Sequence, residues 1–232
     1  LPLTHSLPTT LNIEARGDKS ILLRILPLGD SITWGFAAGA QGSNGYRQQL
    51  LSDLQTSGYK VDFVGTQKSG NMADNDNQGH SGYRIKQIQD VAGPGLAMRP
   101  NIVLIHAGTN DFLQNDMTNG ESWYDAPKRL TALIESVAAS NPDALIIVAK
   151  IIQSGISQAQ SLTTLFNNNV PTVVSQAQAK NIKITYVDQS VVGVNELFDG
   201  IHPSPSGYNH MGHIWAQGVI DASNRNLITS PR

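Results

Sequence analysis

The chain has 232 residues, of which 40% are hydrophobic and 15% charged, the size and composition of one soluble globular domain. Its net charge of -2 gives no reason to expect a nucleic acid or an anionic membrane as partner. The lack of cysteine excludes disulfides, cysteine nucleophiles and thiolate metal sites. No apolar run approaches the roughly 20 residues that a membrane-spanning helix needs.

Residues 1–20 are polar, contain prolines and show no clear period, so we predict a loose lead-in segment. The first residue is Leu1 rather than an initiator Met, and the basic-then-apolar signature of a signal peptide is missing. We interpret the start as a processed or trimmed terminus and expect a mature, secreted protein. A terminus cut by an experimenter is the alternative.

After residue 20, short apolar runs alternate with segments whose apolar residues recur at helical spacing. The strongest strand prediction is 101–106, a nearly continuous apolar run typical of a strand covered on both faces. Residues 66–82 are rich in Gly, Asn and Asp and are predicted to form a loop. In chain order we predict strands at 21–26, 61–64, 101–106, 144–149 and 182–187, and helices at 46–56, from 85 onward, at 125–139, at 160–180 and at 204–222. The alternation indicates an α/β fold with a parallel sheet, helices on both faces and a single domain over residues 21–232.

Three polar segments stand where open α/β sheets bind their ligands, beyond strand ends or in a long loop. They are Gly29-Asp30-Ser31, Gly108-Thr109-Asn110-Asp111 and Asp199-Gly200-Ile201-His202. Each alone has an ordinary explanation, as a turn, a helix cap or a turn followed by a surface histidine. Their occurrence together, in this order, favours one active site over independent coincidences.

Acyl transfer needs a nucleophile, a base that takes its proton, and donors aimed at the developing oxyanion. Ser31 supplies a hydroxyl, and histidine is the side chain that most readily exchanges a proton near neutrality, which makes His202 the candidate base. Asp199 lies three positions earlier, so one turn of backbone can bring its carboxylate to the imidazole. We interpret Asp30 and Asp111 as residues that hold loops by bonding backbone amides.

The three blocks resemble those of the SGNH (GDSL-type) hydrolase superfamily. The remaining block, a glycine between the first two, is best matched by Gly82, with Gly79 as a nearby alternative. The resemblance implies a three-layer α/β/α sandwich, flavodoxin-like, around a mostly five-stranded parallel sheet. It also implies the catalytic residues Ser31, Asp199 and His202, and an oxyanion hole made of the Ser31 N–H, the Gly82 N–H and the side-chain amide of Asn110.

Within that superfamily, residues 26–33, 79–84 and 105–111 are most similar to the acetylxylan esterases of carbohydrate esterase family 3. This resemblance implies removal of O-acetyl groups from a carbohydrate, in particular acetylated xylan, through an acetyl-serine intermediate, with no cofactor and no metal. Trp34, Tyr83 and Trp123 are candidate faces for sugar stacking, although buried packing is the ordinary role of each. Two alternatives stay open: an esterase of the lipase or lysophospholipase kind acting on longer acyl chains, and a non-catalytic glycan-binding protein.

Other signals are weaker. Residues 74–79 resemble the start of a calcium loop, but Ile85 stands where the bidentate glutamate belongs, so we predict a solvated loop. His210 and His213 have helical spacing without the glutamate of a zinc motif and are predicted to be ordinary helix residues. The sequence contains no G-x-S-x-G, P-loop or G-x-G-x-x-G motif. We expect a monomer whose partner is the carbohydrate substrate.

Overall fold

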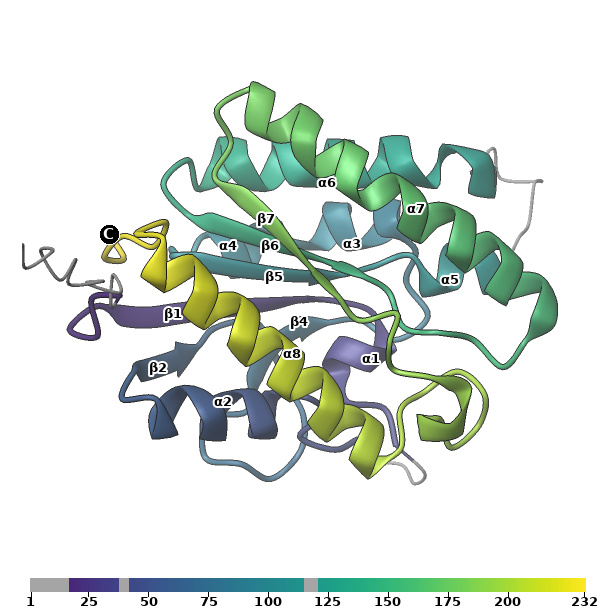
Figure 1. Ribbon diagram of the computed structural model, residues 1–232, viewed down its shortest axis with the longest axis horizontal. Coiled ribbons are helices and arrows are strands. Elements are labelled where there is room, and N and C mark those ends of the chain that lie inside the picture. Colours follow the sequence, from purple (N-terminus) through teal and green to yellow (C-terminus); the bar gives the residue numbers. More distant parts are fainter. Residues whose placement is uncertain (1–16, 38–41, 115–120) are drawn as a thin grey trace, which may run out of the picture.

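A computed structural model describes residues 17–37, 42–114 and 121–232 and shows one mixed sheet between two layers of helices (Figure 1). The lead-in predicted for residues 1–20 therefore lies mostly outside the described residues. The strands of the described part are β1 (Leu22–Gly29), β2 (Lys60–Phe63), β3 (Gln67–Lys68), β4 (Asp76–Gly79), β5 (Ile102–His106), β6 (Leu145–Lys150) and β7 (Ile184–Asp188).

Four parallel pairings join five of these strands in the order β2-β1-β5-β6-β7. This is the flavodoxin-like order, in which the chain winds first to one side of β1 and then to the other, so the switch point lies between β1 and β5. Gly29, at the end of β1, pairs with His106, at the end of β5. The segments that follow these two strands therefore leave the sheet side by side.

Helices cover both faces of the sheet (Figure 1). One face packs against α3 (Ile85–Val91), α4 (Gly93–Leu96), α6 (Ala126–Ser140) and α7 (Ser157–Ala179). The other packs against α2 (Arg47–Thr56) and α8 (Pro205–Asn224). Leu26 and Leu28 face the first layer and Leu23 and Ile25 the second, because side chains along a strand alternate between its faces. The three-layer fold and the parallel sheet expected from the sequence are confirmed.

The predicted loop 66–82 is wrong in part, because it contains β3 and β4. β4 pairs with the last residues of β1, beyond the point where β2 has ended, and β3 pairs antiparallel with β4. The strand Asp76-Asn77-Gln78-Gly79 has no apolar residue, so its composition indicates a loop. Buried Asn77 and Gln78 instead satisfy neighbouring polar groups with their side-chain amides. Because β4 pairs with the end of β1, the loop after Gly79 begins close to the switch point.

Candidate active site

Ser31 is the first residue of α1 (Ser31–Trp34), a single helical turn directly after β1. The Asp30 carboxylate caps this turn by accepting a hydrogen bond from the Ile32 N–H at 2.9 Å. Gly35 ends the turn in the left-handed conformation, with φ of 88°. Gly29 must be a glycine, because a Cβ there would lie 2.3 Å from the His106 carbonyl oxygen. The tight strand-to-helix turn therefore sets the Ser31 hydroxyl at the end of the sheet.

His202 and Asp199 come from the loop before α8 and meet Ser31 across the switch point. The Ser31 Oγ lies 2.9 Å from His202 Nε2, and His202 Nδ1 lies 2.7 Å from an Asp199 carboxylate oxygen. The other Asp199 oxygen accepts hydrogen bonds from the backbone N–H groups of Ile201 and His202, and Gly200, which precedes Ile201, has a positive φ of 84°. The three side chains thus form one continuous chain of hydrogen bonds.

The electrostatics of Asp199 suit a residue that remains an anion. Partial burial acts to raise its pKa, but hydrogen bonds from the His202 backbone, the His202 ring and the Ile201 backbone together hold the pKa of Asp199 below its ordinary value. A carboxylate anion in contact with Nδ1 fixes the imidazole with a hydrogen on that nitrogen. Nε2 is then left to accept the Ser31 proton.

Two phenylalanines that the sequence analysis did not identify pack against the His202 ring. The Phe36 ring centroid lies 4.3 Å from that of His202, and the Phe198 centroid lies 6.0 Å from it. Phe36 is held by its backbone carbonyl, which accepts a hydrogen bond from the Tyr208 hydroxyl at 2.8 Å. Only 13% of the His202 side chain is exposed as a result of this packing and its neighbours. The Phe36 and Phe198 rings also lie 6.3 Å from each other, so one aromatic cluster restricts the orientation of the imidazole.

The structure distinguishes the two glycines that could belong to the oxyanion hole. A Cβ on Gly79 would lie 2.3 Å from the Trp34 backbone nitrogen, so Gly79 is needed for packing β4 against α1. Gly82 has φ of 79° and open space where a Cβ would be. An open glycine lets a substrate approach the backbone closely. The geometry therefore favours Gly82 over Gly79 as the oxyanion donor.

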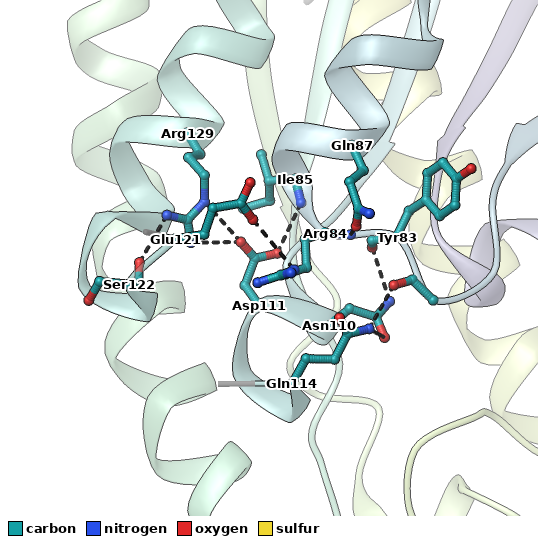
Figure 2. A network of polar contacts seen from close by, with 11 residues as sticks. Tyr83, Arg84, Ile85, Gln87, Asn110, Asp111, Gln114, Glu121, Ser122 and Arg129 are labelled. Carbon is teal, nitrogen blue, oxygen red and sulfur yellow. Dashed lines mark hydrogen bonds and ion pairs between the residues drawn. The ribbon is translucent and has the colours of Figure 1, made fainter. Parts of the chain in front are cut away.

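The loop of Gly82 is tied to α5 (Thr109–Leu113) by amide side chains (Figure 2). Asn110 Nδ2 donates to the Tyr83 carbonyl at 3.0 Å, and Gln114 Nε2 donates to the Gly82 carbonyl at 2.7 Å. The Asn110 amide carries two hydrogens and Tyr83 takes one, so the second is available to an oxyanion. The structure thus brings Asn110 and the Gly82 loop together and fixes their relative position.

A buried ion pair between Asp111 and Arg129 connects α5 to α6, and Asp111 also bonds the start of α3, next to the loop of Gly82 (Figure 2). One Asp111 oxygen accepts from Arg129 Nε and Nη2 at 3.0 and 2.8 Å, and the other accepts from the Ile85 N–H at 3.0 Å. The Asp111 side chain is fully buried, and Arg129 is 12% exposed. Arg84, next to Tyr83, forms a further ion pair with Glu121. Asp30 and Asp111 therefore both bond backbone amides, as we predicted.

Two buried ionisable residues lie near the nucleophile, and one of them, Asp30, directly precedes Ser31 in the chain. Burial raises the pKa of Asp30 to about 7, although hydrogen bonds from the Ile32 amide and the Thr109 hydroxyl act to lower it. Burial lowers the pKa of His106 to about 4, so this imidazole is neutral near pH 7; its Nε2 accepts weakly from the Ile152 N–H at 3.4 Å. Asp30 directly follows β1 and His106 is the last residue of β5, and these two strands are neighbours in the sheet.

The aromatic candidates for sugar stacking have other contacts. The Trp34 ring lies where a Cβ on Gly42 would be, and Trp123 packs against the core on the side of α6. Tyr83 stacks on His80 with ring centroids 5.1 Å apart, and only its backbone carbonyl contacts Asn110. Substrate contact by Trp34 or Tyr83 stays a prediction. Phe198, which is 40% exposed beside His202, is an aromatic ring that the sequence analysis did not identify, as is Phe36.

The weaker signals are used within the fold. Asp74 accepts the Phe63 N–H, Asp76 pairs with Lys68, and no group of three carboxylate, His or Cys side chains suited to a metal ion occurs in the described ranges. His210 pairs with Glu196 and His213 with Asp53, both on the surface of α8. None of the described helices is long and apolar enough to cross a membrane.

Residues 28–210 match the model of the GDSL-like Lipase/Acylhydrolase family, a span that includes all the blocks described above. The chain belongs to this family. It is accordingly a carboxylic ester hydrolase of the SGNH type. The resemblance expected from the sequence is confirmed.

Solved structures and a curated relative agree with this assignment. A family 3 carbohydrate esterase from Clostridium thermocellum is 30% identical, covers 90% of this chain and 100% of its own, and superposes with a TM-score of 0.74. A family 3 carbohydrate esterase from Talaromyces cellulolyticus shares the fold, with a TM-score of 0.71, 24% identity and coverage of 88% and 99%. A multidomain esterase from Ruminococcus flavefaciens is 26% identical over 90% of this chain. The chain spans about 30% of the length of that relative.

Proposed function

We propose that this hydrolase removes O-acetyl groups from a carbohydrate, with acetylated xylan as the expected polymer, through an acetyl-serine intermediate. The observation that carries the proposal is the hydrogen-bond chain from Ser31 through His202 to Asp199. Similarity over the whole length of a family 3 carbohydrate esterase supports a carbohydrate ester as substrate.

In the first step, His202 Nε2 takes the Ser31 proton while Oγ forms a bond to the acetyl carbonyl carbon. The carbonyl π pair moves to the oxygen, and the Ser31 N–H, the Gly82 N–H and the free Asn110 hydrogen stabilise the oxyanion. Collapse breaks the bond to the sugar oxygen, which takes the proton from His202. Throughout, the Asp199 anion balances the charge of the imidazolium.

In the second step, water replaces the sugar hydroxyl. His202 takes a proton from this water as its oxygen attacks the acetyl-serine carbonyl, and the same donors hold the second oxyanion. Collapse breaks the bond to Ser31 Oγ, which takes the proton from His202, and releases acetic acid, which gives up its own proton to the solvent and leaves as acetate. The enzyme is regenerated without a cofactor or metal in any step.

Acetate release from acetylated xylan tests the substrate, and hydrolysis of p-nitrophenyl acetate against the octanoate tests the acyl length. We expect release of acetate from the polymer and a strong preference for the short ester. A preference for octanoate would support a lipase-like esterase instead. Failure to turn over any ester would support a non-catalytic glycan-binding protein. Ser31→Ala serves as the inactive control, and its circular dichroism spectrum should match that of the wild type.

Secretion, a monomeric state and a single domain over residues 21–232 stay predictions. Signal-directed export, the mass in solution and limited proteolysis test them one by one.

A further inference from the structure

A cavity of about 590 Å³ opens beside the His202 loop, between the N-terminal ends of α2 and α8 and the segment at 70–71. Its size is within the range of small-molecule and cofactor sites. Phe198 belongs to both places, since its ring faces His202 and also lines the cavity. The cavity therefore adjoins the candidate active site on the side of the imidazole.

The described lining of this cavity holds no charged side chain, although 15% of the whole chain is charged. Amides, hydroxyls, prolines and one exposed aromatic ring form its wall. Such a surface offers hydrogen bonds without attracting either sign of charge, and its apolar parts suit the C–H faces of a sugar ring. It fits a neutral polyhydroxyl ligand better than a phosphorylated or acidic one.

Two amides of the wall, those of Gln48 and Asn71, are oriented by a third, Asn44. Its Nδ2 group donates to Gln48 Oε1 at 2.8 Å and to Asn71 Oδ1 at 2.9 Å. Its Oδ1 accepts from the backbone N–H groups of Asn71 and Met72 at 2.7 and 3.0 Å. Because both partner amides use their oxygen on Asn44, their NH₂ groups are the ends left to donate to a ligand.

We propose that this cavity binds a neutral sugar residue of the alcohol part of the ester, next to the residue that carries the acetyl group. The inference rests on the proposed function. His202 delivers a proton to the departing sugar oxygen, so the sugar chain must leave the reaction centre on the His202 side, where the cavity lies. Gln48 and Asn209, both exposed on its rim, are the side chains expected to bind ring hydroxyls.

The test uses Gln48→Ala and Asn209→Ala, with Gln55→Ala as the matched control. Gln55 is an exposed glutamine of the same helix as Gln48, and it does not line the cavity. Binding of xylotetraose is measured by calorimetry in the Ser31→Ala background, with tetragalacturonate as the acidic counterpart. The ratio of kcat/KM for an acetylated xylo-oligosaccharide to that for p-nitrophenyl acetate is measured in the active background.

We expect each cavity variant to weaken xylotetraose binding and to lower the kcat/KM ratio by about fivefold, the effect of one lost hydrogen bond. Gln55→Ala should change neither quantity, and tetragalacturonate should bind at least tenfold more weakly than xylotetraose. If the oligosaccharide is hydrolysed but both cavity variants behave like Gln55→Ala, this inference is overturned and the proposed function stands. If p-nitrophenyl acetate is hydrolysed but no sugar ester is, the proposed function fails as well.

Discussion

Asp111→Asn provides a quantitative test of how the Gly82 loop is held. The Asp111 carboxylate is fully buried, binds Arg129 through two nitrogens and caps the Ile85 N–H at the start of α3. Burial raises the pKa of Asp111 even though the Ile85 amide and Arg129 act to lower it. The ion pair therefore offsets its own desolvation only in part.

Replacing Asp111 by asparagine removes the carboxylate that Arg129 pairs with and leaves the Arg129 charge in place with 12% exposure. Removing one partner of a buried pair costs about 3–5 kcal/mol of unfolding free energy. For a chain of this length each kcal/mol lowers Tm by about 2–4 °C, so we expect a loss of roughly 6–20 °C. The kcat for p-nitrophenyl acetate should also fall, by about tenfold, because Ile85 anchors the loop that carries Gly82.

Thermal unfolding followed by circular dichroism measures the first effect, and initial rates measure the second. Asp90→Asn is the matched control, since Asp90 pairs with Lys86 on the exposed face of α3 and should cost less than about 0.5 kcal/mol. The double variant Asp111→Leu with Arg129→Met should recover much of the lost Tm, because no buried charge is left unpaired. If the Tm of Asp111→Asn lies within about 2 °C of the Tm of Asp90→Asn, the Asp111 carboxylate does not stabilise this region as described. The margin of about 2 °C is the smallest change in Tm expected for about 1 kcal/mol.

Three further changes have defined outcomes. The folded pKa of Asp30 is about 7 and its ordinary value is 3.8, so the unfolded chain loses this proton first and stability should fall as pH rises from about 4 to 7. Asp30→Asn should remove a decline on the order of 4 kcal/mol, measured by urea unfolding across that range; an unchanged pH dependence would contradict the assignment. Phe36→Leu should lower kcat about two- to tenfold with little change in KM, because the ring that orients His202 is lost, and a wild-type kcat would show the stacking to be incidental. Gln114→Ala should lower kcat about fivefold by releasing the Gly82 carbonyl, whereas an effect confined to KM would argue against a role in the oxyanion loop.

The main strands and helices were predictable because their apolar residues repeat in patterns that only a buried strand or an amphipathic helix requires. Ile102–His106 is buried along its whole length and could be recognised from its composition. β4 could not, because its stability comes from the fit of two polar side chains between β1 and its neighbours rather than from apolar burial. Local composition does not record such long-range partners.

The same limit applies to the candidate site. Ser31, Asn110 and His202 stand in short blocks at element ends, and the parallel sheet brings those ends to one edge. Phe36 and Phe198 occur in no such block, and their stacking on His202 depends on how two distant loops meet. The buried contact between Asp111 and Arg129 likewise joins two elements whose separation in space no spacing rule predicts.

The transfer of the acetyl group to Ser31 is tested most directly by mass spectrometry of the enzyme quenched in acid during turnover of p-nitrophenyl acetate. We expect wild-type protein to gain the mass of one acetyl group, located on the peptide that contains Ser31, and the Ser31→Ala variant to gain none. An acetyl group found on another residue, or an equal gain of mass in the variant, would contradict nucleophilic attack by this hydroxyl.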